Sequence, residues 1–133
     1  MHYLLKFVIT FIVFMGIDLI WLGFIARKLY VSYLGPFLRT PPNWPAAFIF
    51  YILFIIGLII YAIEPAIVAK DVKKALLSGA MFGFFTYMTY DLTNLATLKN
   101  WPIAIVPIDI VWGVILSASV SSISCFIYLK VFG

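Results

Sequence analysis

Four long apolar stretches dominate this sequence, and each is close to the length that a helix needs to cross a bilayer. They cover about residues 3–26, 45–63, 75–97 and 102–129. A membrane-spanning helix requires roughly 20 predominantly apolar residues. Of all residues, 65% are hydrophobic and only 11% are charged, too few charges to cover the surface of a soluble domain of this size. The sequence therefore predicts an all-α integral membrane protein, a single four-helix bundle over residues 1–133.

One connection, over residues 27–44, is longer than the others and carries two patterns. Its first half places aromatic and apolar residues at helical spacing beside two basic ones: Tyr30, Tyr33, Leu34 and Phe37, with Arg27 and Lys28. This arrangement is typical of a short interfacial helix lying on the membrane surface. The second half, from Arg39 to Pro45, is too rich in proline to be helical. We expect it to be an ordered loop that leads into the second spanning helix.

The net charge of +4 reflects nine Lys and Arg residues, which cluster at the ends of the apolar stretches. There they meet lipid headgroups, so the expected partner is the lipid bilayer and not nucleic acid. If the four helices alternate in direction, five basic residues lie on the side of the termini and four on the other side. This small excess predicts that both termini are cytoplasmic. On the same side, Glu64 is expected to be solvated near Lys70, Lys73 and Lys74.

Few side chains are available for redox or zinc chemistry. Cys125 is the single cysteine and His2 the single histidine. One chain therefore cannot form an intrachain disulfide or supply paired histidines to haem or zinc. We predict no metal ligands, and the residues indicate no particular cofactor.

Three aspartates lie inside the apolar stretches: Asp18, Asp91 and Asp109. An acid at membrane depth costs at least about 2.5–3.5 kcal/mol on insertion scales, so such residues usually face the interior of a bundle and mark a functional site. With helices alternating in direction, all three acids fall in the half of the membrane that is farther from the termini. We expect them to meet in one polar pocket.

Aromatic and amide side chains accompany these acids. Trp21 follows Asp18 by three residues and Trp112 follows Asp109 by three, so each pair shares a helix face. An indole N–H is a donor only, suited to a carboxylate. The third stretch carries Tyr87, Asp91 and Asn94 on one face. The predicted ligand-binding set is therefore Asp18, Trp21, Tyr87, Asp91, Asn94, Asp109 and Trp112, with Arg27 and Lys99 as charge partners for the acids.

A structural role is the alternative, because polar side chains also hold membrane helices together, at about 0.6 kcal/mol per contact. Small residues at four-residue spacing indicate close packing between helices, and this packing requires no ligand. They are Gly79 and Gly83 in the third stretch, with Gly113, Ser117, Ser121 and Cys125 in the fourth.

Three motifs together resemble a known family: Asp18-Leu-Ile-Trp21-Leu-Gly, Tyr90-Asp91-Leu-Thr-Asn94-Leu-Ala-Thr97-Leu-Lys99 and Asp109-Ile-Val-Trp112-Gly113. The family is the group of small bacterial membrane proteins catalogued as domain of unknown function 2177. The resemblance extends over nearly the whole chain. It implies a multi-pass protein of the bacterial inner membrane and carries no established activity.

Three kinds of function fit this pattern. Acids with aromatic walls suit binding or transport of a small cationic or proton-coupled ligand, and transport by so small a bundle would require a homodimer. Two acids could instead serve a membrane-embedded enzyme that modifies lipid, or three could hold a divalent metal in such an enzyme. The third kind is a non-catalytic partner of another membrane protein. We favour the first.

Overall fold

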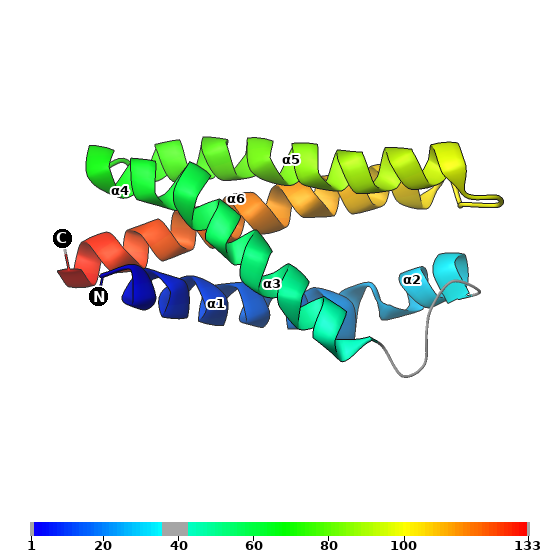
Figure 1. Cartoon of the computed structure of the whole chain (residues 1–133), viewed down its shortest axis with the longest axis horizontal. Coiled ribbons are helices and arrows are strands. Elements are labelled where there is room, and N and C mark those ends of the chain that lie inside the picture. Colours follow the sequence, from blue (N-terminus) through cyan, green and yellow to red (C-terminus); the bar gives the residue numbers. More distant parts are fainter. Residues whose placement is uncertain (1, 36–42, 133) are drawn as a thin grey trace.

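The computed structural model describes residues 2–35 and 43–132, and the regular elements of this part of the chain are all helical. The all-α prediction is confirmed. In chain order the elements are α1 (His2–Ile20), η1 (Trp21–Ile25), α2 (Arg27–Leu34), α3 (Trp44–Leu58), η3 (Ile59–Ile63), α4 (Glu64–Ala69), α5 (Val72–Thr97) and α6 (Ile105–Phe132), where η marks a π-helical turn. Figure 1 shows α5 lying along α6, with α3 crossing obliquely; the start of α1 and the end of α6 lie at the same end of the molecule.

Three helical segments of the described chain are long and apolar enough to cross a membrane: Tyr3–Ile25, Trp44–Ala69 and Ile105–Phe132. The helix α5 has a similar length, 26 residues, but its polar stripe lowers its hydropathy. Long apolar spans are thus present as predicted, whereas a fourth crossing by α5 stays a prediction.

The threonines of α5 largely satisfy their own hydroxyl groups. Thr86, Thr89 and Thr97 donate to the backbone carbonyl four residues earlier at 2.8, 2.6 and 2.7 Å, and Thr93 makes the same contact. A hydroxyl that is bonded within its own helix costs less in lipid than an unpaired one. The stripe is therefore compatible with a bilayer, and most of it needs no ligand.

The second spanning helix is longer than predicted. We expected it to end at Glu64-Pro65, but it continues through η3 and α4 to Ala69. Pro65 has no N–H and would break an ordinary α-helix. Here a π turn precedes it, in which the Glu64 N–H bonds to the Ile59 carbonyl, and Pro65 occupies the first turn of α4. The helix ends at Lys70, whose φ of 53° is left-handed.

A short helix follows the first span, as the pattern of apolar and basic residues predicted. It is α2, and its Leu34 is buried in a small cluster with Trp101, Ile105 and Val106 at one end of the bundle. Phe37 and residues 39–42 of the predicted loop lie outside the described residues.

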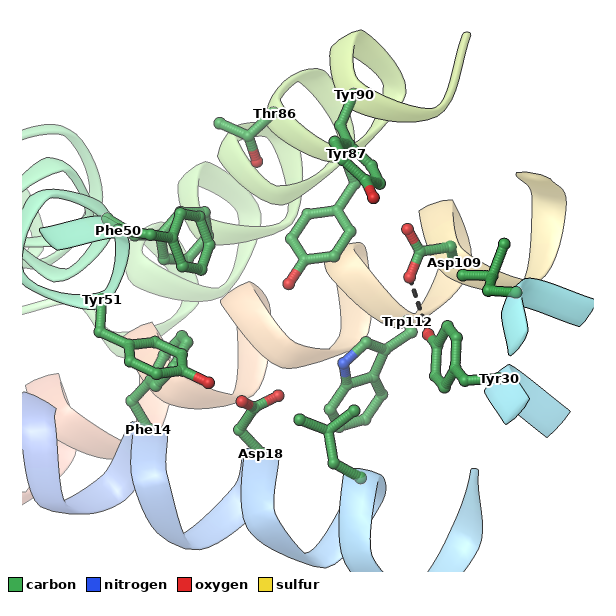
Figure 2. A pocket seen from close by; sticks show the side chains of 13 residues that line it. Phe14, Asp18, Tyr30, Phe50, Tyr51, Thr86, Tyr87, Tyr90, Asp109 and Trp112 are labelled. Atoms are coloured by element: carbon green, nitrogen blue, oxygen red, sulfur yellow. Dashed lines mark hydrogen bonds between the residues drawn. The ribbon is translucent and has the colours of Figure 1, made fainter. Parts of the chain in front are cut away.

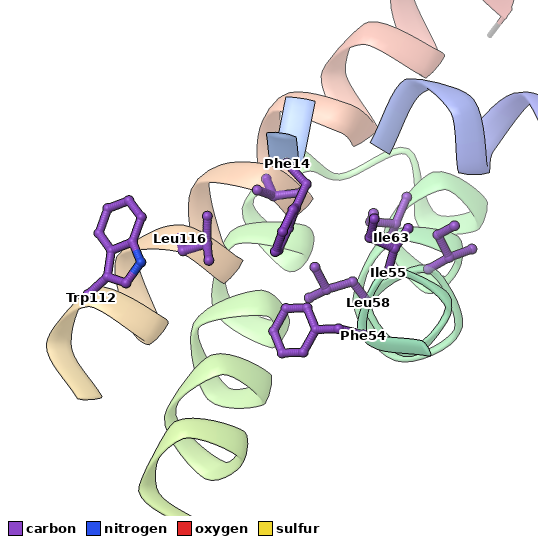
Figure 3. Close-up of a cluster of buried hydrophobic side chains, with 9 residues drawn as sticks. Phe14, Phe54, Ile55, Leu58, Ile63, Trp112 and Leu116 are labelled. Carbon is purple, nitrogen blue, oxygen red and sulfur yellow. The ribbon is translucent and has the colours of Figure 1, made fainter. Parts of the chain in front are cut away.

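Glycines let α5 and α6 approach closely. A Cβ added at Gly79 would lie 2.6 Å from the Ser117 carbonyl oxygen, and one added at Gly83 would collide with the Gly113 carbonyl. The predicted small-residue ridges therefore do form the contact between these helices. Next to this contact, Phe14, Phe54, Leu58 and Leu116 form part of an apolar core between α1, α3 and α6 (Figure 3).

Glu64 is not solvated as expected. It forms an ion pair with Lys6 of α1, and the two side chains are 28% and 7% exposed, respectively. The lysine also lies over the rings of Tyr3 and Tyr128, at 4.9 and 5.1 Å. The bundle brings α4 against α1 and α6 at this end, a long-range contact that local charge spacing did not reveal.

Candidate ligand-binding cavity

A cavity of about 480 Å³ lies between α1, α2, α3, α5 and α6 (Figure 2). Its walls are mainly aromatic, with two acids among them. The lining residues are Phe14, Asp18, Leu22, Tyr30, Leu34, Phe50, Tyr51, Phe54, Thr86, Tyr87, Tyr90, Asp109 and Trp112. None of these described lining residues is basic, so the cavity has an anionic interior with aromatic walls.

Asp18 is one of the two acids, and it is only 6% exposed. The hydroxyl of Tyr51 on α3 and the indole nitrogen of Trp112 on α6 both point at its carboxyl group (Figure 2). Two donors from two other helices thus satisfy an acid that would otherwise be costly to bury.

Asp109 is the other acid, 8% exposed. The Tyr30 hydroxyl donates to its Oδ1 at 2.7 Å, and the Trp21 Nε1 donates to the Tyr30 hydroxyl at 3.3 Å. Burial, together with the negative charge of Asp109, raises the pKa of Tyr30. Tyr30 therefore stays protonated and remains a donor. A chain of two hydrogen bonds fixes the short helix α2 to the bundle.

The indole N–H groups of the two tryptophans are not directed at the aspartates three positions before them. Trp112 points at Asp18, and Trp21 reaches Asp109 through Tyr30. The indoles stack on each other with ring centroids 4.3 Å apart and an interplanar angle of 8°. A residue three positions on lies about 4.5 Å further along its helix. Two antiparallel helices with the same Asp-x-x-Trp order therefore bring their indoles together and exchange acid partners.

Asp91 does not line the cavity. It is 1% exposed in α5, directly beside Asp109, and neither of its oxygens has a hydrogen-bond donor among the described residues. Two carboxylates in contact repel each other unless a proton or a cation lies between them.

Four of the predicted site residues line one cavity: Asp18, Tyr87, Asp109 and Trp112. The remaining three lie around it. Trp21 stacks on Trp112, and Asp91 lies beside Asp109. Asn94 contacts the Tyr90 hydroxyl one helical turn away.

The basic residues expected as charge partners lie elsewhere. Arg27 and Lys99 are exposed, and the ion pair found in the described part of the chain joins Lys6 to Glu64. Their pairing with the acids stays a prediction.

The sequence did not identify Tyr30 and Tyr51 as site residues. Tyr51 carries the only hydroxyl in the apolar helix α3, and this was its available signal. Tyr30 lies in a surface helix, 79 residues from its partner Asp109. No local pattern could have connected the two.

A divalent metal has less support. Across residues 2–35 and 43–132, no group of three or more His, Cys, Asp or Glu side chains is arranged to hold a metal ion.

Fold and cavity together define a helical membrane protein with an acidic, aromatic-walled interior site. Residues 3–126 match the family described as "Predicted membrane protein (DUF2177)", and the chain belongs to this family. No curated protein and no solved structure gives a significant match.

Proposed function

We propose that this protein binds a small organic cation in the cavity between its helices. The observation that supports this most directly is one cavity that holds Asp18 and Asp109, is walled by tyrosine, phenylalanine and tryptophan rings, and has no basic residue in its described lining. A compact inorganic anion or a phosphate would find no counter-charge there. A cation would find both charge and ring faces.

The energetics favour an organic ammonium ion. A cation over an aromatic ring gains about 0.5–1 kcal/mol at exposed sites and about 2 or more when it is desolvated. Aromatic cages are the usual protein environment for substituted ammonium groups, because such groups lose little hydration on entering. A cavity of about 480 Å³ has room for an amine that carries several carbon atoms.

Transport is the extension of this proposal. The adjacent carboxyls of Asp91 and Asp109 need a proton or a cation between them, which would couple proton release to ligand entry. A bundle of this size would require a second copy to enclose a complete pathway. We place the protein in the bacterial inner membrane with both termini cytoplasmic, following the small excess of basic residues on that side.

The test is binding of tetramethylammonium to the full chain in lipid nanodiscs, followed by tryptophan fluorescence because Trp112 lines the cavity. We expect saturable binding that weakens about tenfold or more in Asp18→Asn and in Asp109→Asn, since contacts to a charged group contribute about 1.5–3 kcal/mol.

Asp71→Asn is the matched control. Asp71 is an exposed acid that caps α5, and asparagine caps a helix equally well. The substitution removes the same charge far from the cavity and should leave binding unchanged. No saturable binding to the unaltered protein, or equal weakening by all three substitutions, would refute the proposal.

A further inference from the structure

The lining residues of the cavity differ in their exposed fraction, and this difference shows where the cavity is open. Its floor residues Asp18, Phe54, Asp109 and Trp112 are all buried. By contrast, the two most exposed lining residues are Phe50 of α3 and Tyr90 of α5, at 46% and 52%, followed by Leu22 of η1 at 41%. Figure 2 shows Phe50 and Tyr90 coming from the two helices on either side of this outer part. The cavity therefore opens between α3 and α5.

The separation of α3 and α5 follows from how they pack. Near the cavity floor the Phe54 ring meets Phe82 and Tyr87, with ring centroids 5.2 and 6.2 Å apart. Beyond that point, α5 packs closely on η3 and α4, at the end remote from Trp44. Figure 1 shows that α3 crosses obliquely and leaves α5 toward its own N-terminus. The lining of the cavity includes residues of both helices, among them Phe50 of α3 and Tyr90 of α5.

If α5 spans the membrane as the sequence predicts, this opening faces hydrocarbon and not water. The exposed residues that flank it on α3 are apolar, including Phe48, Ile49 and Leu53. On α5 the exposed residues include Met81, Phe84 and Phe85. Side chains of this kind along a spanning helix contact lipid acyl chains. A ligand that enters between α3 and α5 must therefore come from within the bilayer.

We infer that the ligand is an amphiphile, a cationic ammonium headgroup on a hydrocarbon chain, which enters sideways from the membrane between α3 and α5. This inference rests on the proposed function and names its ligand class. The headgroup lies between Asp18 and Asp109, and the chain passes between Phe50 and Tyr90 into lipid. The anionic interior rejects free fatty acids, which share the chain but carry the wrong charge.

The experiment uses dodecyltrimethylammonium with a photoreactive diazirine midway along its hydrocarbon chain, added to the full chain in phosphatidylcholine nanodiscs. After illumination, labelled peptides are identified by mass spectrometry. We expect labels within residues 47–54 and 82–90, protection by excess tetramethylammonium, and about tenfold less labelling in Asp18→Asn and Asp109→Asn, by the loss of a charged contact. Labelling of Asp71→Asn should match the unaltered protein.

Different results would refute the proposed function and the lateral entry of an amphiphile. If tetramethylammonium binds but the labels fall on residues 27–35 and 98–104, the ligand enters from water and the lateral route is wrong. The same holds if labels on α3 and α5 ignore the aspartate substitutions, since they then reflect ordinary lipid contact. If tetramethylammonium itself does not bind, the proposed function fails and the inference fails with it.

Discussion

Tyr30 links the short helix α2 to the buried acid Asp109. The stability of the fold therefore depends in part on the hydroxyl group of Tyr30. Its O–H donates to Asp109 at 2.7 Å and accepts from Trp21. Removing one partner of such a bond leaves the other buried without compensation. Few hydrogen bonds surround the cavity, so the contribution of each one to stability can be measured with a single substitution.

Tyr30→Phe should lower the free energy of unfolding by about 1.5–3 kcal/mol, the usual contribution of a hydrogen bond to a charged group. The measurement is unfolding by dodecyl sulfate in mixed micelles, followed by circular dichroism. Tyr33→Phe is the control, because Tyr33 is exposed on the same helix, and it should change stability by less than about 0.5 kcal/mol. Equal effects of the two substitutions would show that the Asp109 bond contributes nothing.

The ion pair between Lys6 and Glu64 gives a second prediction at this scale. Glu64→Leu leaves the buried lysine without a counter-charge and should cost about 3–5 kcal/mol in the same unfolding assay. The double variant Lys6→Met with Glu64→Leu removes both charges and should regain most of this loss. A double variant as unstable as Glu64→Leu would mean that packing, and not the unpaired charge, dominates.

The packing of α5 on α6 depends on residues that have a very small side chain or none. The α5–α6 contact uses Gly79 and Gly83 against the backbone and serines of α6. In lipid no hydrophobic effect drives helices together, so close van der Waals contact and short-range polar contacts must do so. This explains why the most extensive contact between described helices joins α5, the most polar of the long helices, to α6.

Gly83→Ala should destabilise the bundle by about 1–3 kcal/mol, the usual cost of overpacking, because the added methyl would collide with the Gly113 carbonyl and lie 2.6 Å from the Ser117 hydroxyl. Gly16→Ala in α1 is the matched control. No other heavy atom lies within 4 Å of a Cβ built there, so alanine should be neutral or slightly stabilising through its better helix propensity. Both are compared by dodecyl sulfate unfolding, and a neutral Gly83→Ala would contradict the close contact.

Whether α5 crosses the membrane decides the topology of the whole molecule. Its 26 residues lie within the 23 to 28 residues of the other spans, and it runs antiparallel along α6 (Figure 1). A crossing by α5 would put both termini on one side, together with the α4–α5 turn. The small excess of basic residues suggests that this side is cytoplasmic.

Cysteine accessibility tests this topology. In a Cys125→Ala background, we expect Lys99→Cys to react with an impermeant maleimide on intact cells, whereas Lys70→Cys and Lys130→Cys should react only after the membrane is opened. Lys70 precedes the start of α5 and Lys99 follows its end, so they report on its crossing directly. Labelling of both from the same side would show that α5 does not span the bilayer.

The all-helical fold class could be predicted from the apolar stretches alone. A chain this apolar must satisfy its backbone within helices in lipid, so stretches of about 20 apolar residues predict helices reliably. The same argument singled out the three aspartates, because acids are costly in hydrocarbon wherever they lie. It misjudged the end of the second helix, because the π turn that accommodates Pro65 has no local sequence signal.

Which side chains contact each other depends on how the helices pack, and this could not be read from local sequence patterns. Asp18 and Asp109 share a cavity because α1 and α6 pack antiparallel, and the same packing gives each acid a donor from a distant part of the chain. Helical spacing orders residues around one axis and says nothing about the neighbouring axis. Tyr30, Tyr51 and the Lys6–Glu64 pair therefore became visible only once the helices were placed side by side.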